Sequence, residues 1–339
     1  MNEKSALICG ISGQDGTLLA KLLLSKGYQV YGTSRDAEVC SARNLERLEI
    51  RDKVKIVSMA PTDFRSVLQV IQATAPDEIY NLSGQSSVAL SFLQPVETLD
   101  SIAKGTLNLL EAIRFLDRPI RFYNAGSSEV FGDTQGTPAN EMTPFRPRSP
   151  YGVAKASAIW EVINYRESYG LFACSGILFN HESELRPNRF IIKKIVNAAC
   201  RIKLGEAFRL DIGNVDIARD WGWAEEYVYA MHKMLQVDTP DDFVIATGET
   251  NSLRTVLDLV AEKLQIEWDK SLSVNDTLFR PSDIPTSNAD PVKAKRYLGW
   301  SSEVKIDDLL DKLISAELKE LTTACNILDK NKNISRARR

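Results

Sequence analysis

The sequence predicts an α/β fold, with a doubly wound parallel sheet followed by a smaller C-terminal lobe of mixed α/β structure. Three observations support this prediction. Short apolar runs alternate with helical patterns through the first half of the chain, glycines follow the first apolar run, and the alternation weakens after Asn180. Strands that alternate with helices indicate parallel strands joined by right-handed crossovers, the pattern of a Rossmann sheet.

The predicted strands are the apolar runs at residues 6–9, 29–32, 54–59, 78–82, 121–125 and 172–179. The predicted helices span residues 17–26, 64–74, 104–115, 193–204, 253–264 and 306–321. We assign residues 1–179 and about 214–250 to the sheet domain, and about 180–213 and 251–325 to the second lobe. Residues 326–339 end in Arg336, Arg338 and Arg339, and we expect a flexible tail there rather than a nucleic-acid arm.

The composition is that of a globular protein, with 44% hydrophobic and 26% charged residues. The net charge of −3 gives no reason to expect binding to nucleic acid or to an anionic membrane. Five scattered cysteines and two histidines far apart in the sequence argue against a disulfide framework and against a metal site. The start of the chain is polar, and no apolar run approaches the ~20 residues that cross a bilayer. We therefore expect a cytoplasmic protein without a membrane segment or metal.

A glycine-rich turn follows the first strand and leads directly into a helix. Its spacing, Gly-x-x-Gly-x-x-Gly, lets the backbone turn tightly and approach a pyrophosphate at the helix N-terminus. A ligand-free turn is the alternative, but its place after the first strand of an alternating fold favours a dinucleotide. The residues predicted to bind the cofactor here are Gly10, Ser12, Gly13, Gln14, Asp15 and Gly16.

The end of the second strand indicates which nicotinamide cofactor is bound. NAD enzymes place an acid at this point, whereas NADP enzymes place an arginine near the 2′-phosphate. Ser34 occupies the expected acid position, and Arg35 follows it, with Arg43 in the next loop. Asp36 would favour NAD if the register were shifted. We predict NADP, with NAD as the alternative.

A second motif suggests proton transfer. Tyr151 and Lys155 are four residues apart, so they share one face of a helix. A nearby cation is expected to lower the pKa of the phenol toward the pH at which a general base works. Ser127 and Glu129 follow the fifth strand, at the end of the sheet where the cofactor enters. A surface pair and a solvated strand end are the alternatives, but the three motifs in this order predict a catalytic site.

At this point the sequence resembles the extended short-chain dehydrogenases and, among them, the GDP-mannose 4,6-dehydratase family. The resemblance spans about residues 7–300. The segments that carry it are GISGQDG (10–16), EIYNLSGQ (78–85), SSEVFG (127–132), RPRSPYGVAK (146–155), GILFNHES (176–183), RDWG (219–222), DFVIATGE (242–249) and Arg280-Pro281.

The resemblance implies a dehydration with no net oxidation. Tyr151, assisted by Lys155 and Ser127, takes the proton of the sugar 4-hydroxyl while hydride passes from C4 to NADP. Glu129 removes the C5 proton as water leaves from C6, and hydride then returns to C6. The product is a 4-keto-6-deoxy sugar.

The resemblance also implies further binding residues and a homodimer or homotetramer. Leu82, His181, Tyr151 and Lys155 would contact the cofactor. Arg219 would bind the phosphates, Asn180 the diphosphate region, and Arg280 with Asp283 the nucleoside. The other implied substrate residues are Ser86, Ser128 and Lys194.

The sequence departs from the family pattern at several places. Ser127 replaces the usual threonine, Ala60 replaces an aspartate near the adenine, and Glu184–Pro187 (ELRP) replaces Pro-Arg-Arg-Gly. The loop after Arg35 lacks the usual serine-rich run. A different sugar nucleotide, such as a GDP-heptose, is therefore an alternative. A 4-keto-sugar reductase, an epimerase and a non-catalytic binding protein are the other hypotheses.

Overall fold

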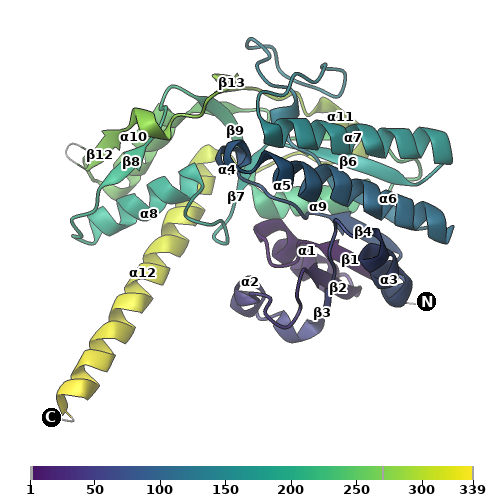
Figure 1. Ribbon diagram of the computed structural model, residues 1–339. Coiled ribbons are helices and arrows are strands. Elements are labelled where there is room, and N and C mark those ends of the chain that lie inside the picture. The colour runs from purple at the N-terminus through teal and green to yellow at the C-terminus, as the bar shows by residue number, and fades with distance from the viewer. Residues whose placement is uncertain (1–2, 269–270, 338–339) are drawn as a thin grey trace.

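The computed structural model describes residues 3–268 and 271–337, and its central layer is a parallel sheet of seven strands (Figure 1). The strand order is β10-β6-β5-β4-β1-β2-β3. The order reverses direction between β1 and β4, which confirms the predicted doubly wound fold and puts a ligand crevice at that point. The strands are β1 (Ser5–Cys9), β2 (Gln29–Ser34), β3 (Val54–Ser58), β4 (Glu78–Asn81), β5 (Arg121–Ala125), β6 (Ala173–Leu178) and β10 (Phe243–Ile245).

Helices cover both faces of this sheet. Successive side chains of a strand point to opposite faces, and β1 shows this clearly. Ala6 and Ile8 pack into one buried cluster, while Leu7 and Cys9 pack into another. The first cluster includes residues of α1 (Gln14–Ser25), α9 (Ala224–Met234) and α11 (Val292–Leu298). The second includes residues of α3 (Phe64–Thr74), α6 (Gly105–Leu116) and α7 (Pro150–Tyr169).

Helix α7, which carries the Tyr-x-x-x-Lys motif, is bounded by local sequence signals. The Ser149 side chain accepts a hydrogen bond from the Gly152 N–H at 3.0 Å, and Pro150 occupies the first helical position. Gly170 ends the helix in the left-handed conformation, with φ of 68°. These signals fix which turn of the helix holds Tyr151 at the carboxyl end of the sheet.

The second lobe has its own hydrophobic core, built around Val196, Trp221, Leu257 and Leu313. Its helices are α8 (Ile191–Lys203), α10 (Leu253–Leu264) and α12 (Ile306–Ala337). Its strands are short and mixed in direction, and the chain enters the lobe through β7, which directly follows β6 of the main sheet and pairs with β9. Strand β9 lies within residues 214–250, which we assigned to the sheet domain, but it pairs with strands of this lobe. These strands are β7 (Asn180–Glu182), β8 (Leu210–Ile212), β9 (Ala218–Trp223), β11 (Thr250–Ser252), β12 (Leu272–Val274) and β13 (Thr286–Ser287).

Short elements complete the described chain. They are α2 (Arg43–Arg47), η1 (Arg51–Lys53), α4 (Val88–Leu93), α5 (Pro95–Leu99), η2 (Asp100–Lys104), η3 (Ser128–Val130) and η4 (Asp276–Leu278). The alternating pattern did not predict β10, because this strand has only three residues and follows a long excursion into the second lobe.

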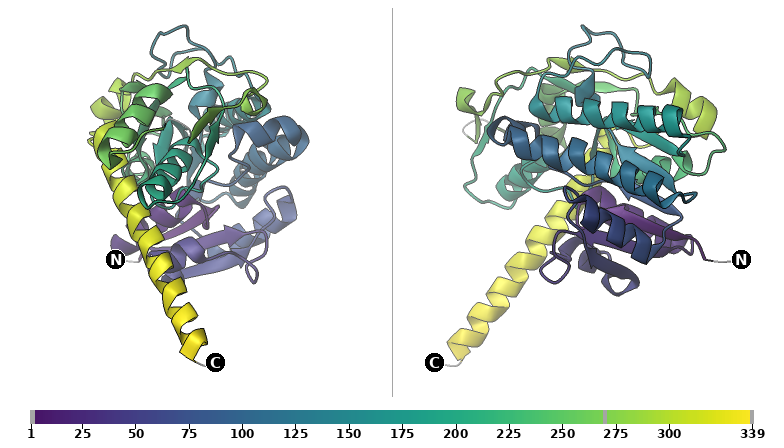
Figure 2. Two further views of the ribbon diagram at one scale, coloured as in Figure 1. Left: turned by 90° about the vertical axis from the view of Figure 1, so that its left-hand side faces the viewer. Right: turned by 45° about the vertical axis from the view of Figure 1, so that its right-hand side comes forward.

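Helix α12 extends beyond the body of the molecule (Figures 1 and 2). Residues 326–337, where we expected a flexible tail, continue this helix, and residues 338 and 339 lie outside the described part. Within residues 3–268 and 271–337, no helix is both long and apolar enough to cross a membrane.

Candidate active site

The glycine turn joins β1 to α1 and has the geometry that the sequence predicted. Gly10 has a φ of +87°, and a Cβ atom there would lie 2.7 Å from the carbonyl oxygen of Leu82. A Cβ atom at Gly16 would collide with the carbonyl oxygen of Gly10. Gly13 precedes the first turn of α1 and supplies no capping side chain. The turn thus leaves the helix N-terminus open to an anion, which fits the pyrophosphate of a dinucleotide.

A buried hydrogen-bond network anchors this turn to β7. Gln14 Nε2 donates to Asp15 Oδ1 at 2.9 Å, and the Ser183 hydroxyl donates to Gln14 Oε1 at 2.9 Å. His181 Nε2 lies 2.9 Å from Asp15 Oδ2, and its ring stacks on Tyr227 with the centroids 4.5 Å apart. The structure therefore brings Gln14, Asp15 and His181 together, although 166 residues separate the last two.

Arg35 is exposed directly after β2, where it is free to meet a phosphate. The Asp36 carboxylate instead accepts a hydrogen bond from the Glu38 N–H at 2.9 Å, so it caps its own turn. Arg43 lies 3.5 Å from Glu320 of α12, with its side chain 79% exposed. Ala60, which replaces the family's aspartate near the adenine, follows β3, and its N–H donates to the Ser66 hydroxyl at 3.0 Å.

The predicted proton-transfer pair is buried at the carboxyl end of β5 and the start of α7. Tyr151 and Lys155 are both buried, and Lys155 Nζ lies 5.8 Å from the centre of the Tyr151 ring. Lys155 Nζ donates a hydrogen bond to the carbonyl oxygen of Ala125 at 2.6 Å. Burial lowers the pKa of Lys155 to about 8.

The prediction that Lys155 lowers the pKa of Tyr151 is wrong for the chain by itself. Burial raises the pKa of Tyr151 to about 12, a hydrogen bond with Ser127 acts to lower it, and the charge of Glu129 acts to raise it. Burial outweighs the groups that lower this pKa, and the described hydrogen bond of the Lys155 ammonium group goes to the backbone of Ala125. Ser127, through its hydrogen bond, and Arg186, through its charge, are thus the groups that favour the phenolate in this site.

Glu129 lies in η3, beside Tyr151 and facing the second lobe. Its backbone N–H donates to the Ser127 hydroxyl at 3.3 Å, and its side chain is 16% exposed. Arg280 Nη1 lies 3.7 Å from Glu129 Oε1, and Arg280 Nε lies 3.9 Å from Asp283 Oδ1. The structure therefore brings the predicted base of the sheet domain to Arg280 of the second lobe, which in turn pairs with Asp283.

Arg219 completes this end of the site. Its Nη1 donates to the carbonyl oxygens of Ala218 and Pro285 at 2.8 and 3.3 Å. Its Nη2 is buried and has no hydrogen-bond partner among the described residues. Burial lowers the pKa of Arg219, and the charge of Glu129 opposes this effect. A buried guanidinium with an unpaired nitrogen is a ready site for an anionic ligand.

The side chains of the remaining predicted substrate residues form no described hydrogen bond or ion pair with those of Glu129, Arg219 or Arg280. Asn180 starts β7 opposite Trp221 of β9, and Ser128 is buried at the start of η3. Ser86 is exposed in the loop before α4. Lys194 Nζ donates to the carbonyl oxygen of Asp211, so its described contact is with β8 rather than with the other binding residues.

Sequence reasoning missed Arg186 as a member of the site. Its charge acts to lower the pKa of both Tyr151 and Asp15. Arg186 Nε lies 3.3 Å from Glu182, and its guanidinium stacks on Phe190 at 3.5 Å. The sequence did hold one sign of it: Arg186 is the one arginine that remains where the family has two, in the segment 184–187. Leu185, the residue before it, packs into the hydrophobic core.

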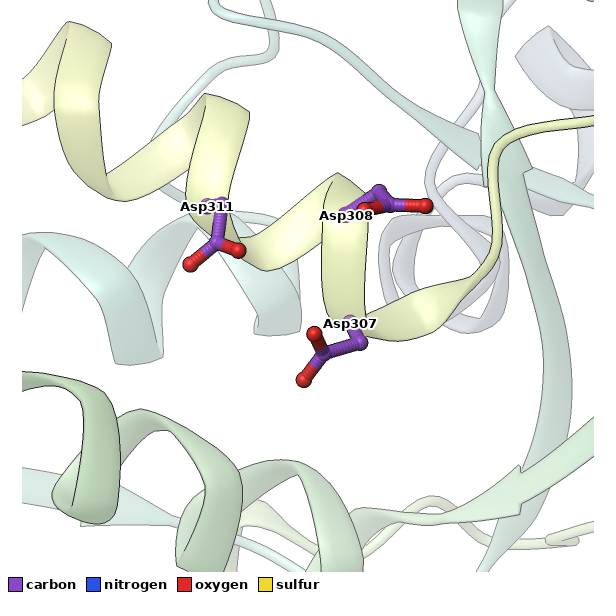
Figure 3. Close-up of side chains that lie close together, drawn as sticks. All are labelled: Asp307, Asp308 and Asp311. Atoms are coloured by element: carbon purple, nitrogen blue, oxygen red, sulfur yellow. The ribbon is translucent and has the colours of Figure 1, made fainter.

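Two other features lie outside this site. A hollow of about 670 Å³ is lined by α1, α9, Trp223, Trp300 and the start of α12, and no predicted site residue borders it. The acidic side chains of Asp307, Asp308 and Asp311 gather on α12 (Figure 3). Lys263 Nζ lies 3.0 and 2.8 Å from Asp307 and Asp311, so a protein cation already pairs with two of these three carboxylates.

Sequence comparison places this chain close to one group of enzymes. A family model described as GDP-mannose 4,6 dehydratase matches residues 7–313. GDP-mannose 4,6 dehydratase 2 of Arabidopsis thaliana is 42% identical over 327 residues, which covers 94% of this chain and 87% of the plant protein. A GDP-mannose 4,6-dehydratase of Vibrio cholerae is 42% identical over 351 residues, covering 94% of each chain.

Solved structures show the same fold at lower identity. UDP-glucose 4-epimerase of Thermotoga maritima, solved with UDP-glucose, has a TM-score of 0.82 at 22% identity and covers 94% of this chain and 99% of its own. The RMD protein of Pseudomonas aeruginosa, solved with NADPH, has a TM-score of 0.76 at 21% identity, with 94% and 99% covered. At this level of identity the likeness concerns the fold.

Proposed function

The chain belongs to the GDP-mannose 4,6-dehydratase family, and from that premise we propose that it removes water from GDP-mannose to give the GDP-4-keto-6-deoxy sugar. It would act as a hydro-lyase. The observation that supports this most directly is the position of Glu129, which lies next to Tyr151 and 3.7 Å from Arg280 of the second lobe. A plain reductase needs one proton-transfer group, whereas elimination needs a second base at C5.

We propose that the sheet domain binds a nicotinamide cofactor, and NADP in preference to NAD. When bound, the nicotinamide supplies hydride acceptance and hydride return, so the sugar is not oxidised overall. The residues that would hold the cofactor are the turn from Gly10 to Gly16, Arg35, Leu82, Tyr151, Lys155 and His181. The open N-terminus of α1 and the exposed guanidinium of Arg35 support this assignment.

Tyr151 would move the proton at the sugar 4-hydroxyl. Its pKa of about 12 shows that the phenol holds its proton firmly in the chain alone. Ser127, whose hydrogen bond opposes that effect, would stabilise the phenolate, and Lys155 would orient the first turns of α7 through its bond to Ala125. Glu129 would then take the C5 proton while water departs from C6.

The second lobe would hold the nucleotide. The buried Nη2 of Arg219, which has no hydrogen-bond partner in the part of the chain that the structure describes, supports a role for this residue at the phosphates. Arg280 lies beside Glu129 and Asp283 beside Arg280, so the two residues would fix the distance between the nucleotide and the reacting sugar carbons. Asn180, Ser86, Ser128 and Lys194 are the other proposed contacts.

We propose a homodimer or homotetramer. Apolar side chains are exposed along neighbouring helices α5, α6 and α7, as expected for surfaces that a second copy covers. They include Val96, Leu99, Leu107, Phe115, Val153, Trp160 and Tyr169. The free thiols of Cys9, Cys40, Cys174 and Cys200 support a cytoplasmic location.

The test is mass spectrometry of the sugar nucleotide after incubation with NADP-loaded protein and no added reductant. GDP-mannose should lose the mass of one water molecule and gain a 4-keto group. A parallel panel of other GDP-, CDP-, UDP- and dTDP-sugars, including a GDP-heptose, defines the specificity. An unchanged mass for every sugar would contradict dehydration, and consumption of NADPH in proportion to product would indicate a reductase.

A further inference from the structure

Arg280 and Glu129 form an ion pair that crosses between the two lobes. Glu129 follows β5 of the sheet domain, and Arg280 follows η4 of the second lobe. Their nearest charged atoms, Arg280 Nη1 and Glu129 Oε1, are 3.7 Å apart. The pair therefore joins the proposed base to a residue of the nucleotide-binding lobe.

The pair is part of a cluster of four charged side chains, Arg219, Arg280, Glu129 and Asp283. The two guanidinium groups and the two carboxylates balance one another, so the cluster carries no net formal charge. Arg219 keeps one buried nitrogen without a hydrogen-bond partner among the described residues. A diphosphate that binds beside Arg219 would add negative charge. The two guanidinium groups would then face the diphosphate as well as the two carboxylates.

Arg280 is the cation best able to change partner. Arg219 is 5% exposed and is fixed by two backbone carbonyls, whereas the side chain of Arg280 is 35% exposed. The distances from Arg280 to its two carboxylates, 3.7 and 3.9 Å, exceed the ~2.7–2.9 Å of a close charge-assisted hydrogen bond. Phosphate oxygens can accept two parallel N–H bonds from one guanidinium, which a loosely held carboxylate at this distance does not do.

We propose that Arg280 is an exchangeable counter-ion of Glu129, which neutralises the carboxylate before substrate binds and transfers to the diphosphate of the nucleotide when it does. The transfer frees Glu129 to take the C5 proton only when the nucleotide is seated. The resemblance places Arg280 at the nucleoside, whereas its neighbours in the structure, Glu129 and Arg219, indicate the diphosphate. This inference rests on the proposed function, because it takes Glu129 as the base.

The proposal predicts competition between a carboxylate and a diphosphate for one guanidinium. The test is the Kd of GDP, measured by isothermal titration calorimetry on the full NADP-loaded chain. Four proteins form a double-mutant cycle: the native chain, Glu129→Gln, Arg280→Gln and the double variant. Glu129→Gln should bind GDP about threefold to tenfold more tightly, because Arg280 is released. Arg280→Gln should bind at least about tenfold more weakly.

The double variant separates a specific exchange from a general effect of charge. If Glu129 acts through Arg280, the tightening caused by Glu129→Gln disappears once Arg280 is replaced. Arg148→Gln is the matched control, because Arg148 donates to Ser282 near Arg280 but forms neither a hydrogen bond nor an ion pair with Glu129 in the structure. The tightening should persist in that background. The proposal is overturned if Glu129→Gln tightens GDP binding equally with and without Arg280, or if it does not tighten GDP binding in the native chain.

Steady-state kinetics give a second readout. Arg280→Gln should raise the KM for GDP-mannose about tenfold and leave kcat within about threefold, since Glu129 is free in both bound complexes. A collapse of kcat with an unchanged KM overturns the proposal. Arg280→Lys, which keeps the charge, should bind GDP more weakly than the native chain and more tightly than Arg280→Gln. If GDP binds but GDP-mannose is not dehydrated, the proposed function fails while the cycle still decides the exchange; if GDP does not bind, both fail.

Discussion

His181 joins the two lobes through Asp15, with its Nε2 atom 2.9 Å from Asp15 Oδ2 and its Nδ1 atom 2.7 Å from the carbonyl oxygen of Phe179. Both ring nitrogens therefore face hydrogen-bond acceptors, so the imidazole holds two protons in this arrangement. Burial acts to lower the pKa of His181, but the charge and hydrogen bond of Asp15 raise it above its usual value. The glycine turn is thus tied to β7 by a buried ion pair.

The first prediction is a pH window for this ion pair. Burial acts to raise the pKa of Asp15, but His181 and Gln14 outweigh it and lower the pKa to about 2. The stabilisation is therefore present above about pH 4 and lost as pH falls toward 2. Because the pKa of His181 is raised, the stabilisation that the protonated ring contributes is complete below about pH 6.5. It is lost as the pH rises through the pKa of His181 in the folded chain.

Asp15→Asn tests this window. Between about pH 4 and 6.5 the unfolding free energy of the variant should be roughly 2 kcal/mol lower than that of the native chain. This difference should shrink at lower and at higher pH. Urea unfolding across the pH range measures it, and the Kd of NADP should rise in the same window. A difference that does not change with pH would mean that Asp15 acts through packing alone.

The second prediction concerns the division of labour between Glu129 and Tyr151. Glu129→Gln should lower the rate of dehydration by about 10²–10⁴-fold, because the base for C5 is lost while the hydride-transfer site remains. Single-turnover absorbance should still show NADPH forming, with no deuterium entering C5 from heavy water. Tyr151→Phe is the matched control and should abolish both signals. Full activity of Glu129→Gln would instead favour a reductase or an epimerase.

The third prediction concerns cofactor preference. Arg35→Ala should raise the Kd of NADP by about tenfold or more, because a charge-assisted contact to the 2′-phosphate is lost, and should leave the Kd of NAD unchanged. Fluorescence titration measures both constants. Arg43→Ala is a control with a similarly exposed side chain, and a smaller effect is expected because Arg43 lies beside Glu320. If the two variants are equivalent, the preference does not depend on Arg35.

The fourth prediction concerns the core of the second lobe. Lys193 of α8 and Glu317 of α12 are buried, with Nζ and Oε2 2.5 Å apart, and Asn197 also donates to Glu317. Lys193→Met leaves a buried carboxylate without its cation, so it should cost about 3–5 kcal/mol of unfolding free energy. Replacing both partners with Met and Leu should restore most of the loss. Thermal and urea unfolding compare the variants, and equal stability of the single and double variants would contradict a buried ion pair.

Much of the fold could be predicted because its signals are local. Residues 64–74 and 253–264 have the predicted helical limits, since a cap and an amphipathic pattern define each one. Strand β10 could not be predicted from alternation, because three residues in a strand carry little pattern. Helix α12 continues past the predicted end at residue 321, in a segment whose polar sequence gave no apolar stripe to follow.

The site divides in the same way. The sequence alone predicted the glycine turn, Ser127, Glu129, Tyr151 and Lys155 as site residues, because each belongs to a short motif at the end of a predicted strand or the start of a helix. It did not identify Arg186, because one arginine in the segment 184–187 does not show that its charge acts on Tyr151 while the neighbouring Leu185 packs into the core. Burial, which sets the pKa of Tyr151, depends on the whole fold and reversed the expected direction.

By itself the sequence determined the order of elements, the dinucleotide turn and the chemical groups available for catalysis, because these depend on residues within a few positions of one another. Only the tertiary structure decided the pairings of those groups. Asp15 meets His181, Lys155 meets the backbone of Ala125, and Glu129 meets Arg280. Each contact joins segments far apart in the chain, and the Coulombic and desolvation energies that set their chemistry depend on distances that only the folded chain defines.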